Sequence, residues 1–246
     1  RLKPMIDDKE KNGVIHLIPT LIGENSPQEV IPFFVKNKIE KLNHFIVENE
    51  KKARRFIKKI LPNKNQNDLI IYELNKFSQQ DEIDDFLSPC FKGISLGLLS
   101  DSGSPCIADP GAKLVSKAHK NDIIVKPLVG PNSILLAMMS SGMNGQNFTF
   151  NGYLPINKKE RIKALIKFQK IAYGDNYPQL FIETPYRNKT LFDEMINVLD
   201  NSTRLCIACD LTLNTEFIKT RSISEWKNRK PNLEKRPCIF IIECGF

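Results

Sequence analysis

The segment ISLGLLSDSGSP, residues 94–105, passes directly from an apolar run into a loop of small polar residues, glycine and proline. The apolar part, 94–99, is typical of a central strand that is buried on both faces of a parallel sheet. The part that follows, 100–105, is typical of the loop at the carboxyl end of such a strand. Ligands of open α/β sheets bind at these strand ends, so the segment predicts both the fold class and the edge of the sheet where a site would lie.

The same alternation of short β-branched runs and amphipathic segments continues on both sides of this segment, as in an α/β protein. The first helix is expected over 26–41, because Ser26, Pro27 and Glu29 supply an N-cap serine, a proline at the first helical position and an acid at the third. The remaining strands are expected at 14–18, 45–47, 69–72, 123–128, 148–154, 180–183, 204–211 and 238–243, and the remaining helices at 50–60, 78–87, 112–119, 134–139, 158–170 and 189–199.

A run of small and polar residues, 140–145, separates the two halves of this pattern and is typical of a hinge or linker. With 246 residues, the chain is long enough for two compact units. We expect a charged N-terminal tail over 1–12, an N-terminal α/β domain over 13–129 and a C-terminal α/β domain over 130–246, with the boundary inside 129–146.

No apolar run approaches the roughly 18 residues of a membrane span, and the N-terminal segment is charged, so we expect a cytoplasmic protein without a secretory signal or membrane span. The six cysteines lie scattered in apolar stretches, which favours reduced thiols over disulfides. Cys206 and Cys209 have the CxxC spacing, but a strand would send them to opposite faces, which favours a buried core over a metal or redox site. Because the three histidines are isolated as well, we expect no metal site.

The net charge of +8 favours an anionic partner such as nucleic acid, although a drift of the composition towards Lys, Asn and Ile would also produce it. Two predicted helices, 50–60 and 158–170, are strongly basic. Each is a candidate to follow RNA phosphates, or else a solvated helix face. The candidate phosphate contacts are Lys51, Lys52, Arg54, Arg55, Lys58, Lys59, Lys158, Lys159, Arg161, Lys163 and Lys167.

Three loops at predicted strand ends are rich in glycine and proline: 19–23, 100–105 with its continuation 109–111, and 130–133. Glycine lets the backbone approach a ligand, so such loops can bind a nucleoside-like cofactor through main-chain atoms, or they can be ordinary turns. The chain has no GxGxxG after its first strand, no GxxxxGK[ST] and no GxSxG. These absences disfavour a nicotinamide dehydrogenase, a P-loop enzyme and an α/β hydrolase.

Five segments occur in the order typical of one known family: IHLIPTLIG (15–23), LSDSGSPCIADPG (99–111), VKPLVGPNS (125–133), FTFNGYLP (148–155) and FIETPYR (181–187). Through them nearly the whole chain resembles the ribosomal RNA small subunit methyltransferase I family of the tetrapyrrole methylase superfamily, in a short form without the helical C-terminal extension of longer members. The resemblance implies two α/β domains with S-adenosyl-L-methionine in the cleft between them, usually in a homodimer. It also implies methylation of a ribose 2′-hydroxyl in RNA of the small ribosomal subunit.

The methyl group of S-adenosyl-L-methionine is already activated, so the protein mainly has to hold it in line with the acceptor. By resemblance, the cofactor contacts are Pro19, Thr20, Asp101, Gly103, Ser104, Pro105, Gly130, Pro131, Ser133 and Leu154. A ribose hydroxyl is a weak acid, and a general base or a cation beside the alkoxide would help; the candidates at predicted strand ends are Glu48, Glu183 and Arg187. Alternatively, the two glutamates cap helices, or Arg187 forms an ion pair with Glu183.

Two other functions are open from the sequence. The first is a small-molecule methylase that acts on a tetrapyrrole-like acceptor. The second is a catalytically inactive cofactor- or RNA-binding protein of ribosome assembly, because the chain departs from the family pattern at 48–51 and at Leu213. The SDSGSP segment favours a retained cofactor site and counts against the inactive protein.

Overall fold

A computed structural model describes residues 12–74, 78, 80–174 and 177–244, and nearly all of the expected N-terminal tail, 1–12, lies outside them. The chain divides into two compact units, Arg1–Pro131 and Asn132–Phe246. Each has its own sheet and its own hydrophobic core. The α/β fold class expected from the sequence is therefore confirmed.

The first unit is built on a parallel five-stranded sheet with the strand order β3-β2-β4-β1-β5. The central strand is β4, as its uninterrupted apolar sequence predicts, and all four of its residues are buried. The strands are β1 (Ile15–Ile18), β2 (His44–Val47), β3 (Ile70–Glu73), β4 (Leu96–Leu99) and β5 (Val125–Pro127).

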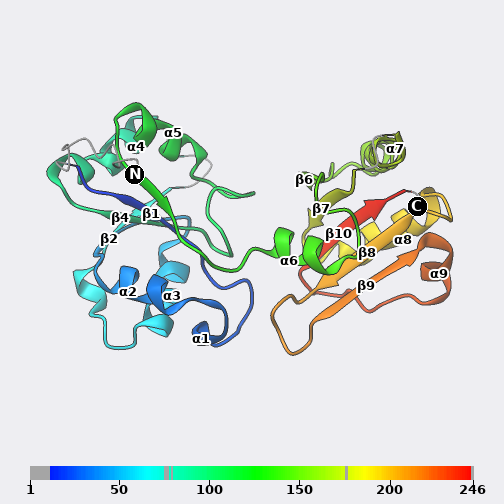
Figure 1. Ribbon diagram of the computed structural model, residues 1–246, viewed down its shortest axis with the longest axis horizontal. Coiled ribbons are helices and arrows are strands. Elements are labelled where there is room, and N and C mark those ends of the chain that lie inside the picture. The colour runs from blue at the N-terminus through cyan, green and yellow to red at the C-terminus, as the bar shows by residue number, and fades with distance from the viewer. Residues whose placement is uncertain (1–11, 75–77, 79, 175–176, 245–246) are drawn as a thin grey trace, which may run out of the picture. The chain divides into compact units, whose positions relative to one another are not determined.

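Helices cover both faces of this sheet, which explains why its central strands are apolar throughout (Figure 1). Alternate strand residues point to opposite faces, so Phe45 packs in the core under α2 and α3 while Ile46 packs in the core under α4 and α5. The helices are α1 (Pro27–Val30), α2 (Phe33–Glu40), α3 (Glu50–Ile60), α4 (Gln80–Leu87) and α5 (Ala112–Lys120), with short 3₁₀ turns at Gln66–Asp68 and Cys90–Lys92.

The single helix expected over 26–41 is wrong, because the chain forms α1 and α2 with a break between them. Proline disfavours a helical conformation in the residue before it, and Ile31 is accordingly extended ahead of Pro32. The expected N-cap bond is also absent among the described residues, since the Ser26 hydroxyl donates to the Gln28 side chain instead of accepting from a helix amide. Sequence spacing alone therefore overestimated the length of this helix.

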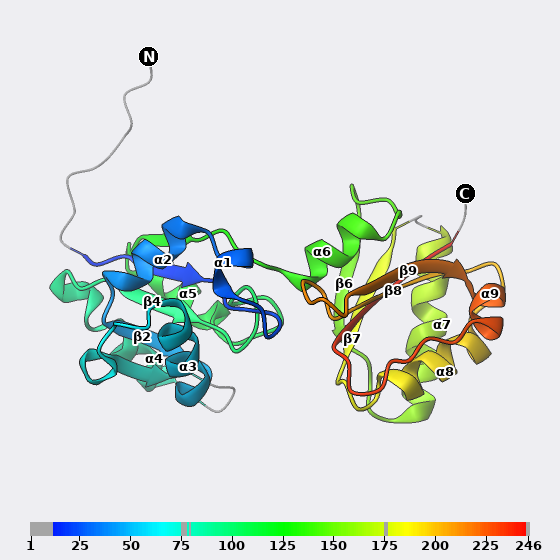
Figure 2. The ribbon, with the colours of Figure 1, turned by 90° about the horizontal axis from the view of Figure 1, so that it is seen from below.

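The second unit has a mixed five-stranded sheet with the order β6-β7-β10-β8-β9, in which only the β6–β7 pair is parallel. Figure 2 shows α7 and α8 packed against this sheet. The strands are β6 (Thr149–Tyr153), β7 (Gln179–Glu183), β8 (Arg204–Cys209), β9 (Phe217–Ser222) and β10 (Cys238–Glu243); the helices are α6 (Ser133–Ser140), α7 (Lys158–Gly174), α8 (Asn188–Val198) and α9 (Ile223–Asn228).

The pair β9–α9 was not expected from the sequence. Strand β9 is an edge strand whose residues are all at least partly exposed, so it lacks a clear apolar pattern. Helix α9 begins with a capping box between Ser222 and Glu225, and it buries Trp226 completely. The Trp226 indole nitrogen donates to the Leu205 carbonyl oxygen at 2.8 Å, and its ring meets Phe192 edge-on.

A buried ion pair in the second unit corrects one sequence expectation. Arg161 of α7 was a candidate phosphate contact, but its guanidinium makes two bonds, of 2.6 and 2.7 Å, to the Glu194 carboxylate of α8. The hydrogen bond and the charge of Glu194 raise the pKa of Arg161. Because the same guanidinium also donates to the Pro155 and Ile156 carbonyl oxygens, Arg161 fastens α7 to α8 and is not available to RNA.

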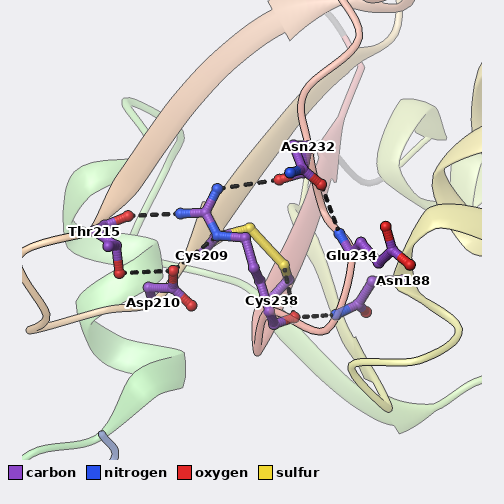
Figure 3. Close-up of a disulfide and its surroundings, with 8 residues drawn as sticks. Asn188, Cys209, Asp210, Thr215, Asn232, Glu234 and Cys238 are labelled. Carbon is purple, nitrogen blue, oxygen red and sulfur yellow. Dashed lines mark hydrogen bonds and ion pairs between the residues drawn. A yellow bond between two sulfur atoms is a disulfide. The ribbon is translucent and has the colours of Figure 1, made fainter. Parts of the chain in front are cut away.

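The expectation that all six cysteines are reduced is also wrong. Cys209 and Cys238 form a disulfide between β8 and β10, with Cα atoms 4.3 Å apart (Figure 3). The antiparallel register sets these two residues directly opposite each other, a relation that spacing within one strand cannot reveal. Cys206 is a buried free thiol, as the core interpretation of the CxxC spacing predicts.

Gly97 in β4 leaves space that the neighbouring strands fill. A Cβ atom at this position would lie 2.7 Å from Ile18 Cδ1 and 2.8 Å from Phe45 Cδ1. We predict that Gly97→Ala lowers the free energy of unfolding by about 1–3 kcal/mol, because these core side chains have to shift. Urea unfolding followed by circular dichroism measures this change.

Gly145→Ala is the matched control, because a Cβ atom there meets no atom within 4 Å. Identical unfolding curves for wild type, Gly97→Ala and Gly145→Ala would contradict the tight packing of β4.

Candidate functional site

Three loops leave the first sheet side by side because the strands before them are parallel and in register. Ile18 of β1 pairs with Leu99 of β4, and Leu17 pairs with Pro127 of β5. The three loops predicted from glycine and proline content follow these strand ends. The third predicted loop, 130–133, crosses the boundary between the units, and its last two residues belong to the second unit. The site edge inferred from residues 94–105 is thus the edge where all three loops lie.

Hydrogen bonds join these loops to one another. The Thr20 amide donates to the Gly103 carbonyl oxygen at 2.9 Å, and the Thr20 hydroxyl donates to the Ser100 carbonyl oxygen at 3.3 Å. The Ser104 hydroxyl donates to the Pro131 carbonyl oxygen at 3.4 Å. The loop after β4 is therefore bonded to the loop after its neighbour β1 and to the loop after β5, which lies beyond β1 in the sheet.

Two glycines are required for this arrangement. Gly103 has a φ of 74°, a left-handed conformation that favours glycine. At Gly130, a Cβ atom would lie 2.1 Å from Pro19 Cγ, which is impossible without moving one of the two loops. Glycine at 103 allows the left-handed turn, and glycine at 130 allows the backbone to approach Pro19. All three residues are among the predicted cofactor contacts.

Three carboxylates gather beside these loops: Glu48 after β2, and Asp101 and Asp109 after β4. The Asp101 amide donates to the Glu48 carboxylate at 3.4 Å, and the Lys52 ammonium lies 2.6 Å from the Asp101 carboxylate. Burial, together with the charges of Glu48 and Asp101, raises the pKa of Asp109 to about 6. Burial and the charge of Asp101 also raise the pKa of Glu48.

Three carboxylates close enough to raise the pKa of two of them, Glu48 and Asp109, therefore lie at these strand ends, and Lys52 is paired with the third, Asp101. A bound cation would be stabilised there. Asp109 and Lys52 were not among the residues singled out for cofactor or catalysis from the sequence. The sequence did contain a sign of each residue. Asp109 lies in the continuation of the glycine- and proline-rich loop, and Lys52 lies in the basic helix that follows Glu48.

The other predicted site residues belong to the second unit. Ser133 is the first residue of α6, which is capped by the Asn132 side chain, and Leu154 is buried in the core of that unit. Glu183 ends β7, and its buried carboxylate accepts from the Arg187 guanidinium at 2.6 and 3.0 Å. The ion pair considered from the sequence is therefore formed, while the catalytic roles of Glu183 and Arg187 stay predictions.

No helix within the described ranges is long and apolar enough to cross a membrane. Over the same part of the chain, no group of three or more His, Cys, Asp or Glu side chains is placed to hold a metal ion.

Known proteins resemble this chain in sequence over nearly its full length, although no family model matches it. The ribosomal RNA small subunit methyltransferase I of Halalkalibacterium halodurans is 30% identical over 240 residues, which are 96% of this chain and 76% of that protein. The protein of the same name from Buchnera aphidicola subsp. Schizaphis graminum is 29% identical and matches over 96% of this chain and 80% of its own length. The match to the Vibrio cholerae protein of that name is 28% identical and spans 70% of this chain but only 59% of that protein.

Solved structures share the fold at low sequence identity. The methyltransferase CobJ has a TM-score of 0.61 and 13% identity, with 95% of each chain covered. A uroporphyrin-III C-methyl transferase from Thermus thermophilus, solved in complex with S-adenyl homocysteine, has a TM-score of 0.54 and 12% identity, with 94% of this chain and 97% of that chain covered. This chain has two α/β units of the tetrapyrrole methylase fold, and 96% of it aligns with 76% of a relative at 30% identity, so it belongs to the ribosomal RNA small subunit methyltransferase I family.

Proposed function

We propose that this protein is an S-adenosyl-L-methionine-dependent methyltransferase that acts on RNA of the small ribosomal subunit, at a ribose 2′-hydroxyl. The observation that carries the proposal is the set of three hydrogen-bonded loops at the carboxyl ends of β1, β4 and β5. These loops contain most of the predicted cofactor contacts, and they are rigid because they bond to each other. The names of the related proteins support RNA of the small subunit as the acceptor.

The chemistry of the strand ends fits the cofactor. S-Adenosyl-L-methionine carries a positive sulfonium and a positive ammonium, and the carboxylates of Glu48, Asp101 and Asp109 provide a negative field at these loops. The closely approaching backbone around Gly103 and Gly130 offers amide and carbonyl groups to a nucleoside. The residues that would hold the cofactor in this unit are Pro19, Thr20, Asp101, Gly103, Ser104, Pro105, Gly130 and Pro131.

When bound, the cofactor supplies an activated methyl group. The protein then has to hold the acceptor oxygen in line and remove its proton. Glu48 is the proposed proton acceptor, because it follows β2 at the same edge of the sheet and because burial and the charge of Asp101 raise its pKa, which makes it a stronger base. A Glu48 carboxylate oxygen would accept the hydroxyl proton, and the cofactor would supply the methyl group, with its carbon–sulfur bond broken and the carbon–oxygen bond to the ribose formed.

For Glu183 and Arg187 we propose a combined role in the second unit. Arg187 is partly exposed, whereas Glu183 is buried and holds the guanidinium by two hydrogen bonds. Glu183 therefore positions Arg187, and Arg187 offers a cation to the developing negative charge of the acceptor oxygen. The proposal also includes a homodimer in the cytoplasm, where its ribosomal substrate would be found.

The proposed function is tested by incubating the protein and labelled S-adenosyl-L-methionine with small ribosomal subunits from a strain that lacks it. We expect label in a ribosomal RNA, and mass spectrometry of RNA fragments should place it on a ribose. In a parallel incubation with a tetrapyrrole in place of the subunits, label in the tetrapyrrole together with no label in RNA would instead support a small-molecule methylase. Cofactor binding without any transfer would support the inactive alternative.

Glu48→Gln tests the proton acceptor. We predict that kcat falls by about 100-fold or more, because general-base catalysis contributes about that factor. The Kd for the cofactor should rise by only about tenfold, because one negative charge beside the cationic cofactor is also lost. Single-turnover methyl transfer and calorimetry measure the two quantities. A loss smaller than about tenfold would remove Glu48 from the mechanism. Losses of tenfold or less in Glu183→Gln and Arg187→Ala would likewise remove those residues.

Asp109 predicts a pH dependence of cofactor binding. With a pKa of about 6, its carboxylate is charged at pH 7.5 and becomes neutral as the pH falls towards 5. One negative charge beside the cationic cofactor is then lost, so the affinity should weaken by about tenfold over this range. Calorimetry at several pH values measures the effect.

In Asp109→Asn, the affinity should already be lower at pH 7.5, and it should depend less on pH. Glu48 also titrates with a raised pKa, so some dependence should persist in this variant. A variant with the same pH profile as wild type would show that Asp109 does not contribute to cofactor binding.

A further inference from the structure

The basic residues of α3 are not equivalent, although the sequence presents them as one cluster. Arg54 bonds to the Glu50 carboxylate at 2.7 Å and to the Gln66 carbonyl oxygen at 2.6 Å, so it holds the first turn of the helix and the segment after it. Lys58 donates to the Pro62 carbonyl oxygen near the end of the helix. The structure thus gives these two candidate phosphate contacts partners within the chain.

Three other cations, Lys52, Arg55 and Lys59, are three and four residues apart, which places them on one face of α3. All three line a single cavity of about 290 Å³. The loop after β1, residues 20–24, and the loop after β4, residues 100–102, form the other walls of this cavity. It therefore directly adjoins the loops proposed to hold the cofactor.

Among the residues that the structure describes, the three cations of this cavity differ in how firmly they are paired. Lys52 is paired with Asp101 at 2.6 Å, whereas the Lys59–Glu24 distance is 3.8 Å and the Glu24 side chain is 90% exposed. An exposed pair of this kind is weak, so Lys59 can exchange its partner. The Arg55 side chain makes no hydrogen bond or ion pair to the residues that the structure describes.

Phosphate is the anion that this arrangement suits. A guanidinium presents paired N–H donors that match two phosphate oxygens, and a neighbouring ammonium adds a mobile positive charge. The apolar side chains of Leu21, Ile22 and Phe56 also line the cavity and can contact a sugar. A phosphodiester beside a nucleoside has both features, a charged group next to a largely apolar ring face.

We propose that Arg55 and Lys59 bind a backbone phosphate of the acceptor RNA, next to the nucleotide that enters the cofactor loops. This inference rests on the proposed function, since it assigns the substrate contact of the same site. Lys52 stays with Asp101 and orders the wall shared by the two sites. Arg54 and Lys58 bond to main-chain oxygens after the helix, and neither they nor Lys51 line the cavity.

The test compares two double variants that remove the same charge from the same helix. Arg55→Gln/Lys59→Gln removes the proposed phosphate contacts. Lys51→Gln/Lys58→Gln removes two exposed cations that do not line the cavity. Binding of a single-stranded oligoribonucleotide with the sequence of the methylated region is measured by filter binding at several salt concentrations.

We expect the slope of log Kd against log salt to fall by about 1 in Arg55→Gln/Lys59→Gln and to change much less in the control. The KM for small-subunit RNA should rise by about tenfold or more, with a smaller change in kcat. Glu24→Gln should act in the opposite direction, because it frees Lys59, and RNA should bind more tightly. Equal slopes and equal KM values for the two double variants would overturn the inference.

The design separates this inference from the proposed function. Failure of the wild-type protein to methylate any ribosomal RNA contradicts the function itself. Normal methylation by wild type, with Arg55→Gln/Lys59→Gln indistinguishable from its control, contradicts the phosphate contact alone. Thermal unfolding and calorimetry with S-adenosyl-L-methionine establish that each variant is folded and still has a cofactor site.

Discussion

The parallel pairing of β1 with β4, in register at Ile18 and Leu99, is the constraint on which the site of the first unit depends. It brings two loops to the same height at the edge of the sheet, where the Thr20 amide can reach the Gly103 carbonyl oxygen. A shift by one residue would turn each side chain of β4 to the opposite face and bring a leucine to the position that only Gly97 fits. Gly97 helps to hold this register because Ile18 and Phe45 fill the space above it.

The two units use buried charge in different ways. In the second unit, Arg161 and Glu194 compensate each other through two hydrogen bonds, so the pair is satisfied without a ligand. In the first unit, Glu48, Asp101 and Asp109 have the same sign, and burial raises the pKa of Asp109 to about 6. Charged groups that destabilise each other in the absence of a ligand are typical of functional sites, because a bound cation relieves the repulsion.

Features set by local sequence were predictable, and features set by distant partners were not. The buried strand β4 and its glycine- and proline-containing loop follow from the residues themselves, as does the parallel sheet that they imply. The ion pair of Arg161 and the disulfide of Cys209 join residues that are 33 and 29 positions apart, so no local pattern reveals them. The break at Pro32 could have been predicted, because proline restricts the residue before it.

The candidate site shows the same division. Glycine and proline content identified the three loops, because their conformations are local. The bond from Thr20 to Ser100 follows from the adjacent ends of β1 and β4, whereas the bond from Ser104 to Pro131 joins loops of strands that are not neighbours. The sequence could not show which cations of α3 are free to bind a ligand. The partners of Arg54 and Lys58 are carbonyl oxygens of the segment after the helix, and their positions depend on how the chain folds back there. The edge strand β9 escaped notice for a related reason, because its exposed residues carry little hydrophobic signal.

Trp226 is the single tryptophan of the chain, and it is fully buried in the core of the second unit. Its indole donates to Leu205 and contacts Phe192, all within that unit. Intrinsic emission excited at the tryptophan band therefore reports on one half of the molecule only. The first unit, with the cofactor loops and α3, is spectroscopically silent at that wavelength, so a tryptophan introduced there would let the unfolding of each half be observed separately.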